Sequence, residues 1–281
     1  MTTDSEIVEA LQTSGTGAPL FCFPGPNHFR DMAKLMESKR SVFGVDVIKL
    51  YEANPTYSIK QIAGLCIDTI RAYQSRGPYY LCGWSFGGFV AYEMAVQLVS
   101  AGEQVGLLVV LDVGNPAPAT MVTLSESLDF RVTYLSDRLK KYARNLLSGN
   151  LSAFAADALK FITPKPDKMT WFLVEPLFRM LNRPVPKRFQ INNSIVDVAC
   201  RDFKPSIYSG SLVLICAQKR GSEYNLEPTW GWERCVDGPI DIQVVPGDHL
   251  NMMEPPNVSE LVEKLTSYLP GSPTSQPSAG E

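Results

Sequence analysis

Apolar residues in the first half of the chain alternate between short runs and longer helical patterns. The short runs predict strands at residues 20–23, 42–45, 79–82 and 107–111. The last run is apolar at every position, which is typical of a central parallel strand covered on both faces. Helices are predicted after residue 58 and over residues 86–98. The alternation predicts crossover units and an α/β fold with a mostly parallel central sheet.

The first of these helices has a recognisable beginning and one apolar face. Ser58 and Gln61 predict a capping box, in which the Ser58 hydroxyl accepts from the Gln61 N–H and the Gln61 side chain bonds back. The apolar stripe that follows is spaced by three or four residues and consists of Ile59, Ile62, Cys66, Ile70 and Tyr73.

The alternation returns near the C-terminus. Strands are predicted at residues 212–216 and 240–245, and Asn257 is the predicted N-cap of a last helix. One face of that helix carries Leu261, Leu265 and Leu269. Residues 270–281 are rich in Pro, Ser and Gly without an apolar anchor, which predicts a disordered tail or a linker stub, as at the edge of an excised domain.

Between the two halves the alternation stops. Residues 113–204 show helical stripes broken by prolines, and they contain 14 Lys and Arg against 8 Asp and Glu. Since the whole chain has a net charge of −3, the remainder carries −9. We therefore expect an acidic core formed by residues 1–112 and 205–269, with a basic helical lid inserted at residues 113–204.

Composition narrows the class of protein. A length of 281 residues allows one large domain or two small ones, and 45% hydrophobic with 20% charged residues excludes a wholly disordered chain. The net charge of −3 argues against a nucleic-acid binder held by a general positive field. No apolar run is long enough to cross a bilayer, and the first residues are not a signal peptide, so we expect a cytoplasmic protein without a membrane partner.

Six cysteines are scattered singly, and several stand inside apolar runs: Cys22, Cys66, Cys82, Cys200, Cys216 and Cys235. This pattern predicts buried free thiols in a reducing compartment, and not a disulfide framework or a metal site.

The strongest chemical motif is Gly-Trp-Ser-Phe-Gly-Gly at residues 83–88, between a predicted strand and a predicted helix. In this context G-x-S-x-G predicts a nucleophile elbow that holds Ser85 clear of the sheet. Small residues are needed at 83 and 87, where a side chain would collide with neighbouring turns. The Phe86 N–H begins the helix and is the first expected oxyanion donor. The alternative is a glycine-rich turn with an incidental serine.

A serine hydroxyl needs a general base, and the chain has only two histidines. His249 follows the last predicted strand, where the Ser–acid–His chain order of α/β-hydrolases places the base. His28 follows the first predicted strand, and we expect it to line the pocket or to be an ordinary surface residue.

Three carboxylates compete to orient the imidazole of that base. Asp112 directly follows the strand at 107–111, whereas Glu223 lies several residues beyond the strand at 212–216. Asp248 adjoins His249, but adjacent residues seldom aim at the same hydrogen bond. We favour Asp112, because it needs no loop excursion to reach the carboxyl edge of the sheet.

Together these motifs resemble the thioesterase domains that terminate nonribosomal peptide and polyketide synthetases, within the α/β-hydrolase superfamily. The resemblance rests on Leu-Phe-Cys-Phe-Pro-Gly at 20–25, the elbow at 83–88, Asp112, and Pro-Gly-Asp-His at 246–249. The resemblance covers both halves of the core. The insertion at residues 113–204 resembles the family's lid only in its place in the chain and in its helical pattern. In that family the acid follows the strand after the elbow, which supports Asp112 and separates the chain from stand-alone editing thioesterases.

The resemblance implies a reaction. An acyl or peptidyl chain on the phosphopantetheine thioester of a carrier protein passes to Ser85, and water, an internal nucleophile or another nucleophile then releases it. It implies no cofactor bound by this domain and a carrier-protein partner, in the same synthetase. The basic lid fits an acidic carrier, although a solvated helical face explains its charges nearly as well.

The chain departs from the family at the second oxyanion donor. Family members usually place small residues after the Phe-Pro-Gly turn and use a backbone N–H there, but Pro26 has no N–H. The second donor is then expected to be Gly25 or Asn27, or to be weak. Trp84 is expected to line the substrate pocket, together with His28 if that histidine is not simply a surface residue. Because losing one such donor can cost about 3 kcal/mol, a slow hydrolase or an unusual release step is consistent with this sequence.

Two other functions fit the same motifs. A free-standing esterase or lipase would share the triad but act on diffusible esters. A hydrolase-fold binding protein with a catalytically weak site is the non-enzyme alternative, and the departure at Pro26 keeps it open.

Overall fold

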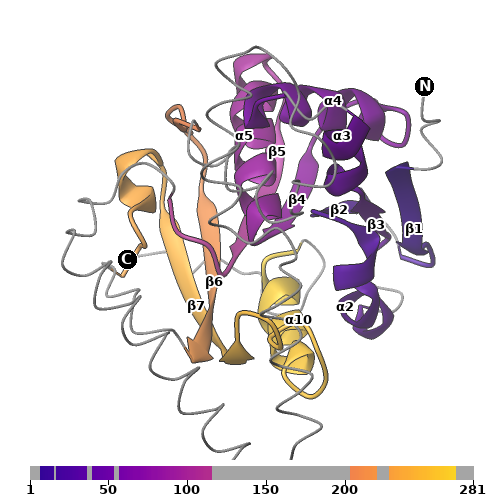
Figure 1. The fold of residues 1–281 in the computed structure, drawn as a ribbon, viewed down its shortest axis with the longest axis vertical. Coiled ribbons are helices and arrows are strands. Elements are labelled where there is room, and N and C mark those ends of the chain that lie inside the picture. The colour runs from indigo at the N-terminus through magenta and orange to yellow at the C-terminus, as the bar shows by residue number, and fades with distance from the viewer. Residues whose placement is uncertain are drawn as a thin grey trace, which may run out of the picture. The chain divides into compact units, whose positions relative to one another are not determined.

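The described part of the chain forms one seven-stranded sheet with helices on both faces (Figure 1). The structure is a computed structural model, and it describes residues 7–15, 17–36, 40–53, 57–115, 203–219 and 228–269. All of them belong to one unit, which joins Met1–Ala117 to Ala199–Glu281. The strand order is β1-β3-β2-β4-β5-β6-β7. Only the pairing of β1 with β3 is antiparallel, and the other neighbours run parallel.

The strands and helices have the following bounds in chain order. The first half contains β1 Val8–Gln12, β2 Leu20–Phe23, η1 Pro26–His28, α2 Arg30–Leu35, β3 Val42–Val45, α3 Val47–Ala53, α4 Ile59–Arg71, β4 Tyr79–Trp84, α5 Phe86–Ser100 and β5 Val105–Leu111. The second half contains β6 Leu212–Lys219, η3 Trp232–Arg234, β7 Ile240–Asp248 and α10 Val258–Ser267.

The sheet separates two apolar layers. On one side α2 and α10 cover a cluster that includes Cys22, Cys82, Val109 and Ile215, one from each of four adjacent strands. On the other side α5 lies against β4 and β5 and packs on α4. Residues 107–111 of β5 are all buried, as the uninterrupted apolar run predicts for a strand covered on both faces.

Every strand predicted from apolar runs is present, and the parallel α/β fold is confirmed. The strands β4, β6 and β7 each extend two or three residues farther at their carboxyl ends than the apolar patterns indicate. The apolar pattern does not predict β1, because this edge strand is only partly buried and its apolar signal is weak. It also missed the short helices α2 and α3, which are too brief to show a helical period.

The capping box at α4 is present as predicted. The Ser58 Oγ accepts from the Gln61 N–H at 3.3 Å, and Gln61 Oε1 accepts from the Ser58 N–H at 2.9 Å. The buried face ends one turn early, however. Tyr73 lies beyond the helix end at Arg71, is 41% exposed, and contacts the ring of Phe43 at 5.2 Å.

Asn257 occupies the expected N-cap position of the last helix, but the expected capping bond of its side chain is absent. Asn257 precedes α10 in helical conformation and makes no side-chain capping bond. Its amide nitrogen donates instead to the carbonyl oxygen and the side-chain Oδ1 of Asn251, at 3.1 and 3.2 Å. A residue of the preceding loop has therefore replaced the helix N–H as the partner of this N-cap asparagine.

Two predicted regions lie outside the described residues. They are the tail at 270–281 and the helical lid at 113–204, apart from residues 113–115 and 203–204. The lid and its boundaries with the core at 1–112 and 205–269 therefore stay predictions. In the part of the chain that the structure describes, no helix is both long and apolar enough to cross a membrane.

Candidate active site

Ser85 stands on a sharp turn between β4 and α5. Its φ of 52° and ψ of −126° lie in a region that a non-glycine residue adopts only at a cost. The Ser85 N–H donates to the Leu111 carbonyl at 3.1 Å, and the Ser85 carbonyl accepts from the Gly88 N–H at 2.8 Å. The turn is therefore tied to the neighbouring strand β5 on one side and to its own helix on the other.

The glycines of the motif are required by close backbone contacts. A Cβ atom on Gly83 would lie 2.2 Å from the Gly87 carbonyl oxygen, and one on Gly87 would lie 2.3 Å from the Phe23 carbonyl carbon. Neither backbone group can yield without moving a strand or the helix, so the sequence spacing of these glycines has a steric cause. Through Gly87, α5 rests directly on the end of β2.

Asp112 follows β5 immediately and also adopts a positive φ, of 51°. Its backbone N–H donates to the Ile215 carbonyl at 2.8 Å, which ties it to β6. Its carboxylate Oδ1 accepts from the Ala217 N–H at 2.7 Å, also on β6. The side chain is only 8% exposed, so one carboxylate oxygen is fixed by backbone and the other is left for a partner.

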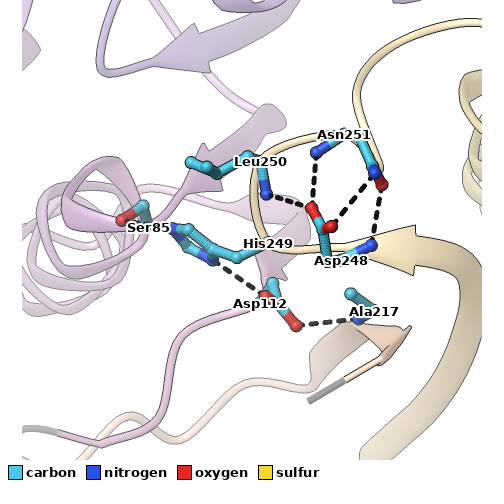
Figure 2. Close-up of polar contacts among 7 residues, drawn as sticks. All are labelled: Ser85, Asp112, Ala217, Asp248, His249, Leu250 and Asn251. Carbon is cyan, nitrogen blue, oxygen red and sulfur yellow. Dashed lines mark hydrogen bonds and ion pairs between the residues drawn. The ribbon is translucent and has the colours of Figure 1, made fainter. Parts of the chain in front are cut away.

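That partner is His249, the residue directly after β7. Its Nδ1 lies 2.8 Å from Asp112 Oδ2, and its Nε2 lies 3.1 Å from Ser85 Oγ. Figure 2 shows the imidazole between the serine and the aspartate. A carboxylate can only accept, so Nδ1 carries the proton and Nε2 is free to accept the Ser85 hydroxyl proton. The arrangement places a hydroxyl, a base and an orienting acid in one hydrogen-bonded chain.

The two other carboxylates considered for the role of orienting acid are Asp248 and Glu223. Asp248 turns toward its own loop, where its carboxylate accepts from the N–H groups of Leu250 and Asn251, each at 3.0 Å, and from the Asn251 side chain (Figure 2). It therefore holds the turn that carries His249. Glu223 lies outside the described residues.

An aromatic row crosses the end of β4. The indole of Trp84 stacks on the His249 ring with centroids 5.1 Å apart, and the His28 ring lies 4.8 Å from the same indole. Partial burial lowers the pKa of His28, and the nearby Asp46 carboxylate opposes that shift. The structure thus brings Trp84 next to the proposed base, while His28 contacts Trp84 and is exposed, so its role as pocket lining or as a surface residue stays a prediction.

The expected oxyanion donors lie on the elbow and on the loop after β2. Phe86 is the first residue of α5, and Gly25 is buried directly before η1. Asn27 is exposed, and its side-chain oxygen accepts from Arg30. The beginning of this loop is held by α3, because the backbone N–H of Val47 donates to the Pro24 carbonyl at 2.7 Å. The donor roles of Phe86, Gly25 and Asn27 stay predictions.

Two sets of contacts at the site were not predicted from the sequence. The Ala217 N–H holds Asp112, but a backbone group on an apolar strand leaves no mark in the sequence. The loop bonds of Asn251 were also missed, although the Asp248–Asn251 spacing is typical of a side chain that caps a turn.

The cysteines within the described residues are free and buried, as predicted: Cys22, Cys66, Cys82, Cys216 and Cys235. Burial raises the pKa of the Cys66 thiol, which makes a reactive thiolate unfavourable there. Cys200 lies outside the described residues. Within the described ranges, no group of three or more His, Cys, Asp or Glu side chains is arranged to hold a metal ion.

The fold and the hydrogen-bonded Ser–His–Asp chain define the class as an α/β-hydrolase with a serine nucleophile elbow. The profile of the family described as "Thioesterase domain" matches residues 18–162, about half of the chain. The chain belongs to this family, and it is therefore a thioesterase of the serine hydrolase class.

The curated relatives are synthetases and synthases that are much longer than this chain. The chain is 28% identical over 274 residues to the probable non-canonical nonribosomal peptide synthetase CymA of Salinispora arenicola, an alignment that covers 94% of this chain and 3% of CymA. It is 26% identical over 269 residues to the indigoidine synthase of Dickeya dadantii, covering 91% of this chain and 17% of that enzyme. The chain thus spans only a small fraction of the relatives that it matches.

Solved structures share the fold. A four-domain nonribosomal peptide synthetase bound to AMP and glycine aligns with a TM-score of 0.65 at 22% identity, covering 94% of this chain and 20% of that one. The thioesterase domain of surfactin biosynthesis, SrfTE, aligns with a TM-score of 0.58 at 14% identity, covering 96% and 99%. At these identities the likeness concerns the fold alone.

Proposed function

We propose that this chain is a product-releasing thioesterase, which takes an acyl or peptidyl group from a carrier-protein thioester onto Ser85 and then releases it. The observation that carries the proposal is the chain from Ser85 Oγ through His249 to Asp112, with distances of 3.1 and 2.8 Å. This geometry supports covalent catalysis, because it gives a weak nucleophile the adjacent, oriented base that it needs.

In the first step Ser85 Oγ attacks the thioester carbonyl while His249 Nε2 takes the hydroxyl proton. Asp112 stabilises the resulting imidazolium through its bond to Nδ1. The tetrahedral intermediate collapses by breaking the carbon–sulfur bond, and the imidazolium gives its proton to the departing pantetheine thiolate. The products of this step are an acyl-Ser85 ester and a free thiol.

In the second step a nucleophile attacks the acyl-Ser85 ester. His249 takes the proton of that nucleophile and then returns it to Ser85 Oγ as the ester bond breaks. Water gives a free acid, and an amine or hydroxyl within the acyl chain gives a macrocycle. The triad geometry serves all of these nucleophiles equally, so the identity of the product depends on the substrate pocket.

The proposed oxyanion site has one donor on each side of the nucleophile. The Phe86 N–H stands at the beginning of α5, where the helix dipole favours negative charge. The second donor is the N–H of Gly25 or Asn27, because Pro26 has none and the His28 N–H already donates to the Gly25 carbonyl at 3.4 Å.

The proposed partner is an acyl or peptidyl carrier domain that belongs to the same synthetase. The support is that the curated relatives are synthetases of which this chain matches only a few per cent to 17%. The substrate would arrive on the phosphopantetheine arm of that carrier. The proposed steps themselves use only side chains and backbone groups of this chain.

The proposal is tested by comparing two substrate types on the wild-type chain and on Ser85→Ala. The wild type should release an acyl group from loaded carrier protein or acyl-pantetheine far faster than from a matched para-nitrophenyl ester. Ser85→Ala should form no acyl-enzyme detectable by intact-protein mass spectrometry. Full turnover by Ser85→Ala would sink the covalent mechanism, whereas a preference for the simple ester would favour a free-standing esterase.

The binding-protein alternative is tested by a serine-reactive fluorophosphonate. The wild type should be labelled at Ser85, with Ser85→Ala as the matched control. Absence of labelling on a folded wild-type chain would favour a weak or inactive site.

A further inference from the structure

One aromatic contact joins the elbow to the histidine loop. Trp84 is the last residue of β4 and directly precedes Ser85. Its indole stacks on the imidazole of His249, with ring centroids 5.1 Å apart and ring planes 24° apart. The two residues come from distant parts of the chain, so the fold and not local sequence makes this contact.

The hydrogen bonds of His249 leave one motion of its ring poorly restrained. Both ring nitrogens are engaged, Nδ1 with Asp112 and Nε2 with Ser85. Both bonds lie near the plane of the ring, so they do little to resist a tilt about the line that joins the two nitrogens. The His249 side chain is also 41% exposed, and packing covers only part of it. The stacked indole covers one ring face and opposes that tilt.

Trp84 is itself well held. Its side chain packs against the apolar cluster under α2 and α10. Its backbone pairs with Leu111, the same residue whose carbonyl accepts the Ser85 N–H. His28 contacts the indole at 4.8 Å and comes from the loop after β2, whereas His249 comes from the end of β7, beyond the other edge of β4. The indole is thus a fixed surface against which the imidazole rests.

The choice of tryptophan here carries a structural cost. The indole Nε1 is buried and has no hydrogen-bond partner within the described parts of the chain. A buried donor without a partner is unfavourable, and a phenyl ring at this position would avoid it. An unfavourable buried group of this kind is expected next to a reactive site when the residue that carries it has a role in the site's function. What tryptophan offers beyond phenylalanine is the aromatic face that binds cations best.

We propose that Trp84 is a positioning residue for the triad: its indole face holds the His249 imidazole in line with Ser85 Oγ and stabilises the imidazolium formed during acyl transfer. The proposal rests on the proposed serine mechanism. It differs from the pocket-lining role expected from the sequence, because the indole acts on His249 and not on the substrate.

The test compares Trp84→Leu and Trp84→Phe with the wild type in two assays. The first is steady-state hydrolysis of an acyl-pantetheine thioester, and the second is the rate constant for fluorophosphonate labelling of Ser85. Tyr73→Leu is the matched control, because it removes an exposed aromatic ring that packs on Phe43 of β3, away from the triad. Thermal melts identify any variant that fails to fold, and Trp84→Met replaces Trp84→Leu in that case.

We expect Trp84→Leu to lower both kcat and the labelling rate roughly threefold to thirtyfold, with KM changed less than twofold. Trp84→Phe should recover most of the loss, and Tyr73→Leu should behave as the wild type. Equal activity of the folded Leu and Phe variants would overturn the proposal. So would an increase in KM at constant kcat, which would make Trp84 a wall of the substrate pocket. A wild type that neither labels nor turns over would instead refute the proposed function.

Discussion

The elbow and the histidine loop hold two parts of one proposed reaction centre by different means. Ser85 is fixed by the backbone alone: the glycines around it leave no room for a Cβ atom against β2 and α5, and its own N–H and carbonyl bond to Leu111 and Gly88. His249 is fixed by polar contacts, in which Asp248 and Asn251 close its turn and Asp112 binds its ring. The nucleophile, whose position must not vary, is thus held by tight backbone packing. The base, which gains and loses a proton, is held by a hydrogen bond to a carboxylate that stabilises its charged form.

The largest effect is expected from adding a methyl group to a glycine of the elbow. In Gly87→Ala the new methyl group would lie 2.3 Å from the Phe23 carbonyl, so β2 or α5 must move. We expect a loss of about 3 kcal/mol in the free energy of unfolding and loss of Ser85 labelling. Denaturant unfolding and fluorophosphonate labelling measure the two effects.

The matched control is Gly64→Ala. Gly64 lies inside α4, and an added Cβ would meet only Gln97 at an ordinary 3.6 Å. The exchange should stabilise the chain by roughly 0.5–1 kcal/mol, because alanine is the better helix former. If Gly87→Ala were as stable and active as Gly64→Ala, the steric account of the elbow would be wrong.

The next largest effect is expected from removing the charge of Asp112. Asp112→Asn keeps the shape but lets the amide donate, so His249 adopts the wrong tautomer and cannot take the Ser85 proton. We expect kcat to fall on the order of 10³- to 10⁴-fold, with little change in the melting temperature. Steady-state kinetics on an acyl-pantetheine thioester measure this fall, and Glu223→Gln serves as the control. A larger loss in Glu223→Gln than in Asp112→Asn would reverse the assignment of the acid.

The smallest effect is expected from loosening the histidine turn. Asp248→Ala removes the acceptor for Leu250 and for both donors of Asn251, so the turn that carries His249 gains freedom. We expect kcat to fall roughly tenfold to a hundredfold, with the triad residues still present. Steady-state kinetics on the acyl-pantetheine substrate measure it.

Asp241→Ala is the matched control on the same strand. Its carboxylate is exposed and binds Tyr268 and Gln243 far from the turn, so kcat should change less than twofold. A loss in Asp248→Ala as large as that in Asp112→Asn would contradict the structure, in which Asp248 faces its loop and not the imidazole.

The comparison also explains how far the sequence could predict this molecule. Steric demands leave marks in the sequence, and so the glycines around Ser85 and the uninterrupted apolar run of β5 predicted the elbow and the parallel sheet. The order of strands then indicated that Ser85, Asp112 and His249 come from one edge of the sheet, where the structure places them in a hydrogen-bonded chain.

What could not be predicted depends on contacts that no local sequence pattern includes. Asn257 satisfies the local pattern of an N-cap, but Asn251 offers it a partner that no local rule includes. The stacking of Trp84 on His249 likewise requires the end of β4 to meet the loop after β7. The edge strand β1 was missed because half-buried strands owe their pairing to a neighbour, here β3, more than to their own residues.

The hydrogen bond from Ala217 to Asp112 has a practical consequence for mutagenesis. Because β6 contributes only the backbone N–H of a residue that is already alanine, an alanine scan of this strand would not test the contact with Asp112 at all. Other substitutions would keep the N–H, but a larger side chain would also disturb the packing around Ala217, which is fully buried in the core. Only a residue without an N–H would expose it, so Ala217→Pro would break the contact, at the further cost of a proline within a parallel strand.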